Sequence, residues 1–201
     1  MTRVLIAEDQ EMVRGALISL LELEHDLEVV AQVGRGDEVV AAARACQPDV
    51  ALLDIEMPGI SGLEALEHLA AELPSVKILI LTTFGRPGYL RRAMEGGAAG
   101  FVLKDAPATE LASAIRRALA GERIVDPGLA AAALSQGQSP LTPREHEVLA
   151  ASRNYTTVAE LADALYLSHG TVRNHLSSVM QKLDARNRGE AVRTAEERGW
   201  L

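Results

Sequence analysis

Four short polar stretches, each directly after an apolar run, hold the side chains of this chain that could do chemistry. Glu8 and Asp9 follow VLIA, Asp54 follows VALL, Thr82 follows ILIL and Lys104 follows FVL. Three carboxylates suit a hard divalent cation such as Mg²⁺, which prefers oxygen ligands. An aspartate can also be the nucleophile in phosphoryl transfer, with an ammonium and a hydroxyl to contact the phosphate oxygens. The set therefore predicts a phosphoryl-transfer site that uses Mg²⁺.

Taken singly, each of these residues has an ordinary structural explanation. Glu8 and Asp9 could cap the first helix, Asp54 could be a turn residue before MPG, and Lys104 could be a solvated lysine. Their order at the ends of successive apolar runs favours one shared site instead.

The elements that would position these residues alternate along the first part of the chain. Short runs rich in Val, Ile and Leu are typical of strands that helices cover on both faces. The pattern predicts an α/β fold, a doubly wound five-stranded parallel sheet, in which functional residues gather at the carboxyl ends of the strands. We expect strands near 3–7, 28–33, 50–53, 77–82 and 100–103, and helices near 10–23, 36–46, 62–72, 87–96 and 108–120. In helix 10–23, the face expected to be buried consists of Val13, Ala16, Leu17, Leu20 and Leu21.

The composition indicates an ordinary globular protein with an uneven charge distribution. Of the 201 residues, 48% are hydrophobic, and the single cysteine rules out an internal disulfide. We expect a cytoplasmic protein without a membrane segment, because no apolar run is long enough and the N-terminus does not resemble a secretory signal. Residues 1–140 carry the whole net charge of −8. Residues 141–201 are neutral and can present a basic face to DNA.

The last third of the chain predicts a helical domain after a linker. We expect the first domain over 1–120, a linker over 121–140 that could contain a short helix, and the second domain over 141–201. Capping boxes begin two helices at Thr142 and Thr157, and Ser168 begins a third. Two short helices followed by a longer one are typical of a helix-turn-helix domain.

The third of these helices has one apolar and one polar side. The apolar stripe consists of Val172, Leu176, Val179, Met180 and Leu183. A helix of this kind can place outward side chains in the major groove, where Arg reads guanine and Asn reads adenine. The residues expected to contact bases are Arg173, Asn174 and Ser177, and those expected to contact phosphates are Ser168, Thr171, Lys182, Arg186 and Arg188. The alternative is that these side chains form only a solvated helix face.

Several motifs resemble the response regulators of the NarL/LuxR class. They are LIAEDQ, LLDIEMPGISGLEAL, ILILTTF and GAAGFVLKD, followed by LTPREHEVL and LYLSHGTVRNHL. IAEDQEM, LTTFGRPGY and ERGWL further resemble the desaturase-controlling regulators that serve membrane-fluidity sensor kinases. The resemblance implies that Asp54 is the phosphoacceptor and that Lys104 contacts the phosphate. It also implies a switch formed by Thr82 and Phe101. Mg²⁺ would be bound by Glu8, Asp9, Asp54 and the main-chain carbonyl of Glu56.

The resemblance also implies the partners and the mode of action. It implies a sensor histidine kinase as phosphoryl donor, promoter DNA as target, RNA polymerase as a further partner, and a homodimer formed on phosphorylation. There are two candidate dimer surfaces. One is helix 10–23 together with helix 108–120, and the other is helix 87–96, which carries Tyr89 and Leu90.

The sequence departs from the family pattern at two positions. Many members of the family have proline directly after the lysine, whereas this chain has Asp105 after Lys104. A cis Lys104–Asp105 peptide bond would cost ~3 kcal/mol. In the turn before the second helix of the helical domain, Tyr155 stands where the family usually has glycine. The preceding helix must then end differently, and we expect Asn154 to adopt the left-handed conformation.

The sequence therefore predicts a DNA-binding transcription regulator and not a metabolic enzyme. One alternative is an atypical regulator whose acidic pocket is not phosphorylated. Another is a Mg²⁺-dependent phosphotransfer enzyme with a nucleophilic aspartate. The chain leaves no room for a substrate-covering domain, which disfavours the enzyme.

Overall fold

The computed structural model describes the whole chain except residues 84–86, 105–107, 136–138 and 199. It consists of two compact units, and the second covers Ala131–Leu201. The division falls inside the segment predicted as linker. The domain limits themselves stay a prediction. None of the described helices is long and apolar enough to cross a membrane.

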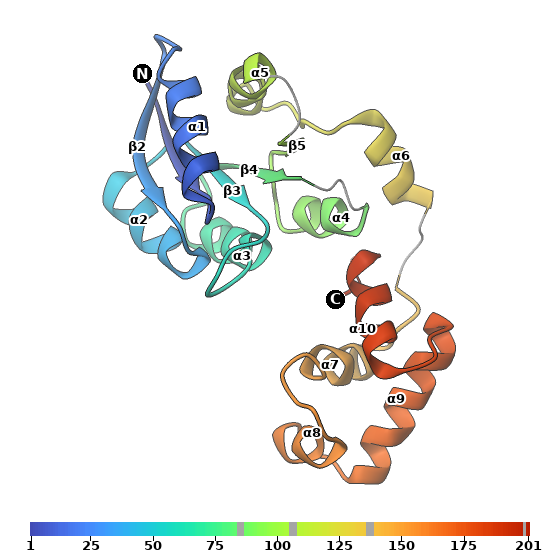
Figure 1. The fold of residues 1–201 in the computed structure, drawn as a ribbon. Helices are drawn as coiled ribbons and strands as arrows, with labels where there is room; N and C mark the ends of the chain where they lie inside the picture. The colour runs from blue at the N-terminus through green and yellow to red at the C-terminus, as the bar shows by residue number, and fades with distance from the viewer. Residues whose placement is uncertain (84–86, 105–107, 136–138, 199) are drawn as a thin grey trace. The chain divides into compact units, whose positions relative to one another are not determined.

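The first unit is built on the predicted five-stranded parallel sheet, in the order β2-β1-β3-β4-β5 (Figure 1). Its strands are β1 Thr2–Ala7, β2 Leu27–Val33, β3 Val50–Asp54, β4 Lys77–Thr82 and β5 Gly100–Leu103. Every residue of β3, the central strand, is buried. This explains why its sequence is a continuous apolar run rather than an alternating one.

Helices lie on both faces of the sheet, so the predicted doubly wound architecture is confirmed (Figure 1). Helices α1 and α5 pack on one face and α2, α3 and α4 on the other. Their bounds are α1 Glu11–Leu21, α2 Val39–Cys46, α3 Gly62–Glu72, α4 Pro87–Glu95 and α5 Ala108–Leu119, with a short 3-10 helix over Gly36–Glu38 and a further helix α6 over Pro127–Ser135.

The predicted buried face of α1 is wrong in part. Ala16 and Leu20 are exposed, and the helix packs on the core mainly through Leu17, Ile18 and Leu21. The stripe of α1 that is buried against the sheet is therefore narrower than the spacing of its apolar residues suggested. Met12, one turn before Ala16, is 85% exposed.

The second unit is entirely helical over its described residues. It contains α7 Pro143–Ala151, α8 Val158–Ala164, α9 His169–Leu183 and α10 Arg188–Glu197. The capping boxes expected at Thr142 and Thr157 are both present. The buried Trp200 and Leu201 pack into the core shared by α7, α9 and α10. The expectation for Asn154 is wrong, because among the described non-glycine residues a positive φ is found at Gln47, Tyr166 and Asp184. The loop before α8 is closed without a left-handed residue there.

Candidate functional site

The carboxyl edge of the sheet brings together the predicted acidic residues. Carboxylate oxygens of Glu8, Asp9 and Asp54 all lie within 4.8 Å of one another. Glu8 and Asp9 directly follow β1, and Asp54 ends β3, which pairs with β1 in the sheet. Glu8 and Asp54 are buried, whereas Asp9 is exposed. The cluster is therefore open to solvent on the side of Asp9.

Lys104 reaches this cluster from the end of β5. Its ammonium nitrogen lies 2.6 Å from Glu8 Oε2 and 2.9 Å from Asp54 Oδ1. The other carboxylate oxygen of Glu8, Oε1, accepts a hydrogen bond from the Gln10 amide. Asp54 Oδ1 also accepts a hydrogen bond from the Ile55 amide at 2.8 Å. The ammonium thus lies between two buried carboxylates and offsets their repulsion.

The charges of these three groups depend on one another. Burial raises the pKa of Glu8 and the pKa of Asp54, although the ion pairs with Lys104 act in the opposite direction. For Lys104 burial acts to lower the pKa, but the two carboxylates outweigh it and the pKa is raised. The lysine therefore stays protonated at neutral pH.

The remaining predicted residues of this site lie on β4, on β5 and in the loop after β3. Thr82 is buried at the end of β4, and its carbonyl oxygen accepts a hydrogen bond of 2.8 Å from the Lys104 amide. Phe101 is buried on β5, and Glu56 is exposed in the loop after β3. The Lys104–Asp105 peptide, for which a cis bond was considered, lies outside the described residues because Asp105 does.

Sequence reasoning missed two residues that lie next to Glu8 and Asp54. Arg14 on α1 donates a hydrogen bond of 2.5 Å to the Glu8 carbonyl oxygen. Gly62 begins α3 against the strand end, and a Cβ added there would lie 1.8 Å from the Asp54 carbonyl oxygen. The position of Gly62, directly after the capping Ser61, was the only sequence signal available.

The donor set fits a hard cation. Three carboxylates at one open edge supply the oxygen ligands that Mg²⁺ and similar ions prefer. Two of them are buried, so they carry a desolvation penalty that a bound cation would reduce. The pocket could therefore bind a metal ion.

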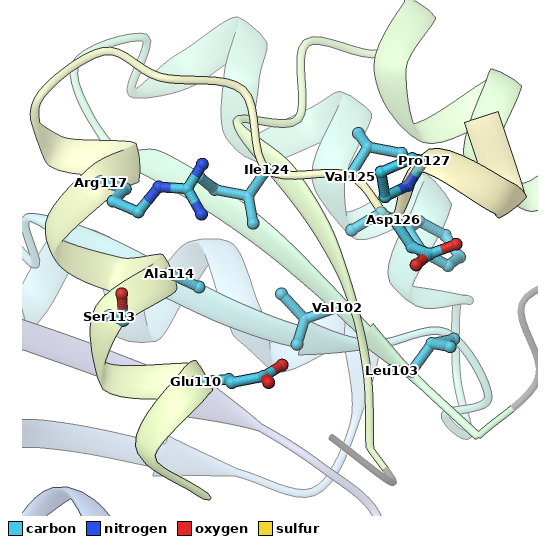
Figure 2. A pocket seen from close by; sticks show the side chains of 11 residues that line it. Val102, Leu103, Glu110, Ser113, Ala114, Arg117, Ile124, Val125, Asp126 and Pro127 are labelled. Atoms are coloured by element: carbon cyan, nitrogen blue, oxygen red, sulfur yellow. The ribbon is translucent and has the colours of Figure 1, made fainter. Parts of the chain in front are cut away.

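A separate cavity of about 480 Å³ lies at the outer edge of β5. Figure 2 shows Glu110, Ser113 and Arg117 of α5 on one side and Asp126 and Pro127 on the other. Its floor includes Val102 and Leu103. None of the clustered acids lines it, so it is not the site of the predicted chemistry.

In the second unit, the residues expected to read bases lie on the exposed side of α9. Arg173, Asn174 and Ser177 are exposed, whereas Val172 and Leu176 are buried. The hydroxyl of Ser168 caps the helix and lies 2.8 Å from the Thr171 hydroxyl. This arrangement leaves the beginning and the outer face of α9 available to a ligand.

Three basic residues expected at phosphates differ in their surroundings. Lys182 donates a hydrogen bond of 2.6 Å to Glu145 Oε2, and Arg188 donates one of 2.7 Å to the Thr156 carbonyl oxygen. Arg186 is exposed. Lys182 and Arg188 thus already stabilise the contacts between helices of this unit.

Glu145 is the centre of a buried polar cluster that joins α7 to α9. It accepts hydrogen bonds from Thr142, Ser178 and Lys182. Burial alone would raise the pKa of Glu145, but these hydrogen bonds outweigh it and lower the pKa to about 2. The cluster connects the start of α7 to Ser178 and Lys182 of α9.

We expect Glu145→Gln to destabilise the second unit by about 2 kcal/mol at neutral pH, because the charge-assisted bonds are lost. The ionised carboxylate stabilises the fold above its unfolded pKa of 4.5, and this contribution disappears as the pH falls toward 2. Denaturant unfolding between pH 7 and pH 3 should show a difference between the two proteins that narrows with acidity. A constant difference would contradict this assignment.

The comparisons with known proteins cover both units. A response regulator receiver domain model matches residues 4–116. A model of bacterial regulatory proteins of the luxR family matches residues 139–195.

Full-length relatives and solved structures agree with these matches. The transcriptional regulatory protein DesR of Bacillus subtilis is 47% identical over 201 residues, all of both chains. The uncharacterized transcriptional regulatory protein YvfU of the same organism is 46% identical over the same span. The crystal structure of the response regulator ChrA of a heme-sensing two-component system is 32% identical, with a TM-score of 0.57 over 99% of this chain and 98% of that one. The RcsB–DNA complex is 25% identical, with a TM-score of 0.67 over 98% of both chains.

Proposed function

Because the chain belongs to the two-component response regulators with a LuxR-type DNA-binding domain, we propose that Asp54 is its phosphoacceptor. A carboxylate oxygen of Asp54 attacks the phosphorus atom of a phosphorylated donor, the bond from phosphorus to the donor breaks, and the donor keeps the electron pair. The product is an acyl phosphate on Asp54. Convergence of Asp54, Glu8, Asp9 and Lys104 at one sheet edge is the observation that carries this proposal.

The other residues of the pocket have complementary roles in this proposal. Glu8, Asp9, Asp54 and the Glu56 carbonyl would hold Mg²⁺, which when bound neutralises charge on the phosphoryl group. Lys104 pairs with a phosphate oxygen, and for this it leaves its present contact with Asp54. Thr82 and Phe101 then transmit the change to the surface of the first unit.

In this proposal the phosphoryl donor is a sensor histidine kinase, and the output is control of transcription in the cytoplasm. The family consists of DNA-binding transcription regulators, which excludes a metabolic phosphotransfer enzyme. Arg173, Asn174 and Ser177 contact bases in the major groove. Ser168, Thr171, Lys182, Arg186 and Arg188 contact phosphates.

The phosphorylated form is proposed to be a homodimer, since one helix-turn-helix module makes few base contacts. Helix α1 is the surface that the exposed side chains favour. Met12, Ala16 and Leu20 are spaced by one turn and all are exposed, and Leu23 beyond the helix is 75% exposed. On the alternative helix α4, by contrast, Leu90 is only 3% exposed.

We expect Met12→Asp to prevent dimer formation, because a carboxylate in an apolar contact loses its hydration. Phosphorylation itself should proceed as in the parent. Analytical ultracentrifugation with acetyl phosphate and Mg²⁺ measures the effect. Ala71→Asp, at an exposed position of α3, is the matched control and should still dimerise. Dimers of equal stability in both variants would exclude α1 as the contact.

DNA binding across genomic fragments, with and without acetyl phosphate, tests the proposed function as a whole. We expect a small set of fragments to be retained, and phosphorylation to raise the affinity for them. Retention that is independent of sequence, or unchanged by a phosphorylation that mass spectrometry verifies, would contradict the proposal.

A further inference from the structure

The turn between α8 and α9 contains a tyrosine in an unusual backbone conformation. Tyr166 has a φ of +54°, in the left-handed region. The Leu167 amide donates a hydrogen bond to the Ala162 carbonyl at 2.8 Å, and the Tyr166 amide donates one to the Asp163 carbonyl at 3.3 Å. Leu167 also packs against the core cluster that contains Ala162. Together these contacts form a Schellman motif with Tyr166 at the position that glycine usually occupies.

A tyrosine at this position destabilises the turn relative to glycine. The left-handed conformation brings Cβ close to the backbone, and only glycine, asparagine and aspartate adopt it readily. The other left-handed residue of this unit, Asp184, belongs to that tolerant group. Tyr166 does not, and its side chain, which is 96% exposed, adds little packing that could offset the cost. Such strain at an exposed side chain points to a contact with another molecule.

The surroundings of Tyr166 indicate which molecule this is. Tyr166 lies two residues before Ser168, the cap of α9, and the Leu165 carbonyl accepts a hydrogen bond from Arg144 at 3.2 Å. The turn is thus fixed from both sides, and the exposed Tyr166 directly precedes the residues that begin α9. Ser168 and His169 at the start of α9 are exposed, as is Asp163 in the turn itself. Donors at a helix start suit phosphate oxygens.

We propose that Tyr166 is a DNA-backbone contact, in which the phenol donates a hydrogen bond to a phosphate oxygen and the ring packs on the adjacent sugar. This inference rests on the proposed DNA-binding function. A backbone contact adds affinity for every sequence and does not change base preference. Loss of Tyr166 should therefore weaken specific and random DNA by the same factor.

Tyr166→Gly separates a DNA contact from a structural role. Glycine relieves the strained φ, so we expect the thermal midpoint of the second unit to stay the same or to rise by roughly 4 °C. At the same time, the dissociation constants of the full-length phosphorylated protein should rise about five-fold, for a genomic fragment that the parent retains and for a random-sequence duplex alike. If Tyr166 had only a structural role, its replacement by glycine would not lower the affinity for DNA while stability stays intact.

Two further variants make the test decisive. Tyr166→Phe keeps the ring and the backbone strain but lacks the hydroxyl, and it should lose part of the affinity even if the glycine variant folds poorly. Gln47→Gly is the matched control, because it relaxes a left-handed residue with a φ of 46° in the first unit and should bind DNA as the parent does.

The outcomes distinguish this inference from the proposed function. Parent-like affinity in both Tyr166 variants overturns the contact. If transcription from the retained fragment is lost while affinity is kept, Tyr166 contacts a protein such as RNA polymerase, and this also overturns the DNA contact. If the parent itself does not bind DNA, the proposed function fails.

Discussion

Asp54→Asn should abolish the incorporation of a phosphoryl group from acetyl phosphate. The amide has nearly the same shape but is not a nucleophile, so the acyl phosphate cannot form. The carbonyl oxygen of the new side chain could still accept the hydrogen bond that the Ile55 amide now donates to Asp54. Because the substitution also removes one of the crowded carboxylates, we expect stability to be unchanged or higher. Loss of labelling would then reflect chemistry and not unfolding.

Intact-mass spectrometry after incubation with acetyl phosphate and Mg²⁺ measures this effect. The parent should gain one phosphoryl group per chain, and the variant none. Asp26→Asn is a suitable control, since Asp26 precedes β2 at the opposite end of the sheet. Undiminished labelling of the Asp54 variant would transfer the acceptor role to another residue, with Asp9 as the nearest exposed carboxylate.

Gly62→Ala should destabilise the first unit by about 3 kcal/mol and slow phosphorylation at the same time. The added methyl carbon would lie 1.8 Å from the Asp54 carbonyl oxygen, which is a backbone atom and cannot rotate away. Either α3 moves outward or the end of β3 moves, and both cost energy in a close-packed core. The Gly62 amide also donates a hydrogen bond to the Ile55 carbonyl at 2.9 Å, so the shift would reach the acceptor strand.

Urea unfolding and the rate of labelling by acetyl phosphate together test this expectation. Gly15→Ala is the matched control, because a Cβ at Gly15 within α1 would meet nothing within 4 Å. There alanine should stabilise the helix by about 0.5–1 kcal/mol. If Gly62→Ala leaves both stability and rate unchanged, the close approach of α3 to Asp54 has no functional importance.

The sequence predicted the first unit well because its fold is encoded locally. Each strand is a short apolar run, and each functional residue of the pocket stands directly at the end of such a run, so the order of strands sufficed to bring Glu8, Asp54 and Lys104 together. Periodicity was less informative for α1. Alternation of apolar residues shows that a stripe exists, but it does not show how much of it the sheet covers, so Ala16 and Leu20 were wrongly assigned to the core.

Contacts between distant residues set the limit of prediction. The sequence does not show that Lys182 pairs with Glu145, because the two residues are 37 positions apart. The position of Gly62 after the capping Ser61 indicated a helix start but not its close approach to Asp54, which depends on the angle at which α3 meets the strand. The left-handed residue expected at Asn154 is absent there because the loop closes through an ordinary turn, in which the Asn154 amide donates a hydrogen bond to the Ala151 carbonyl.

The position of Trp200 gives the protein a built-in optical reporter. It is the single tryptophan of the chain, it is 7% exposed in the core of α7, α9 and α10, and the Arg198 guanidinium lies 5.0 Å from its ring centre. Emission excited at the red edge of the indole band therefore arises from the second unit alone. Circular dichroism, by contrast, records both units. Following one sample by both signals during heating would resolve whether the two units melt together or one after the other, without any label.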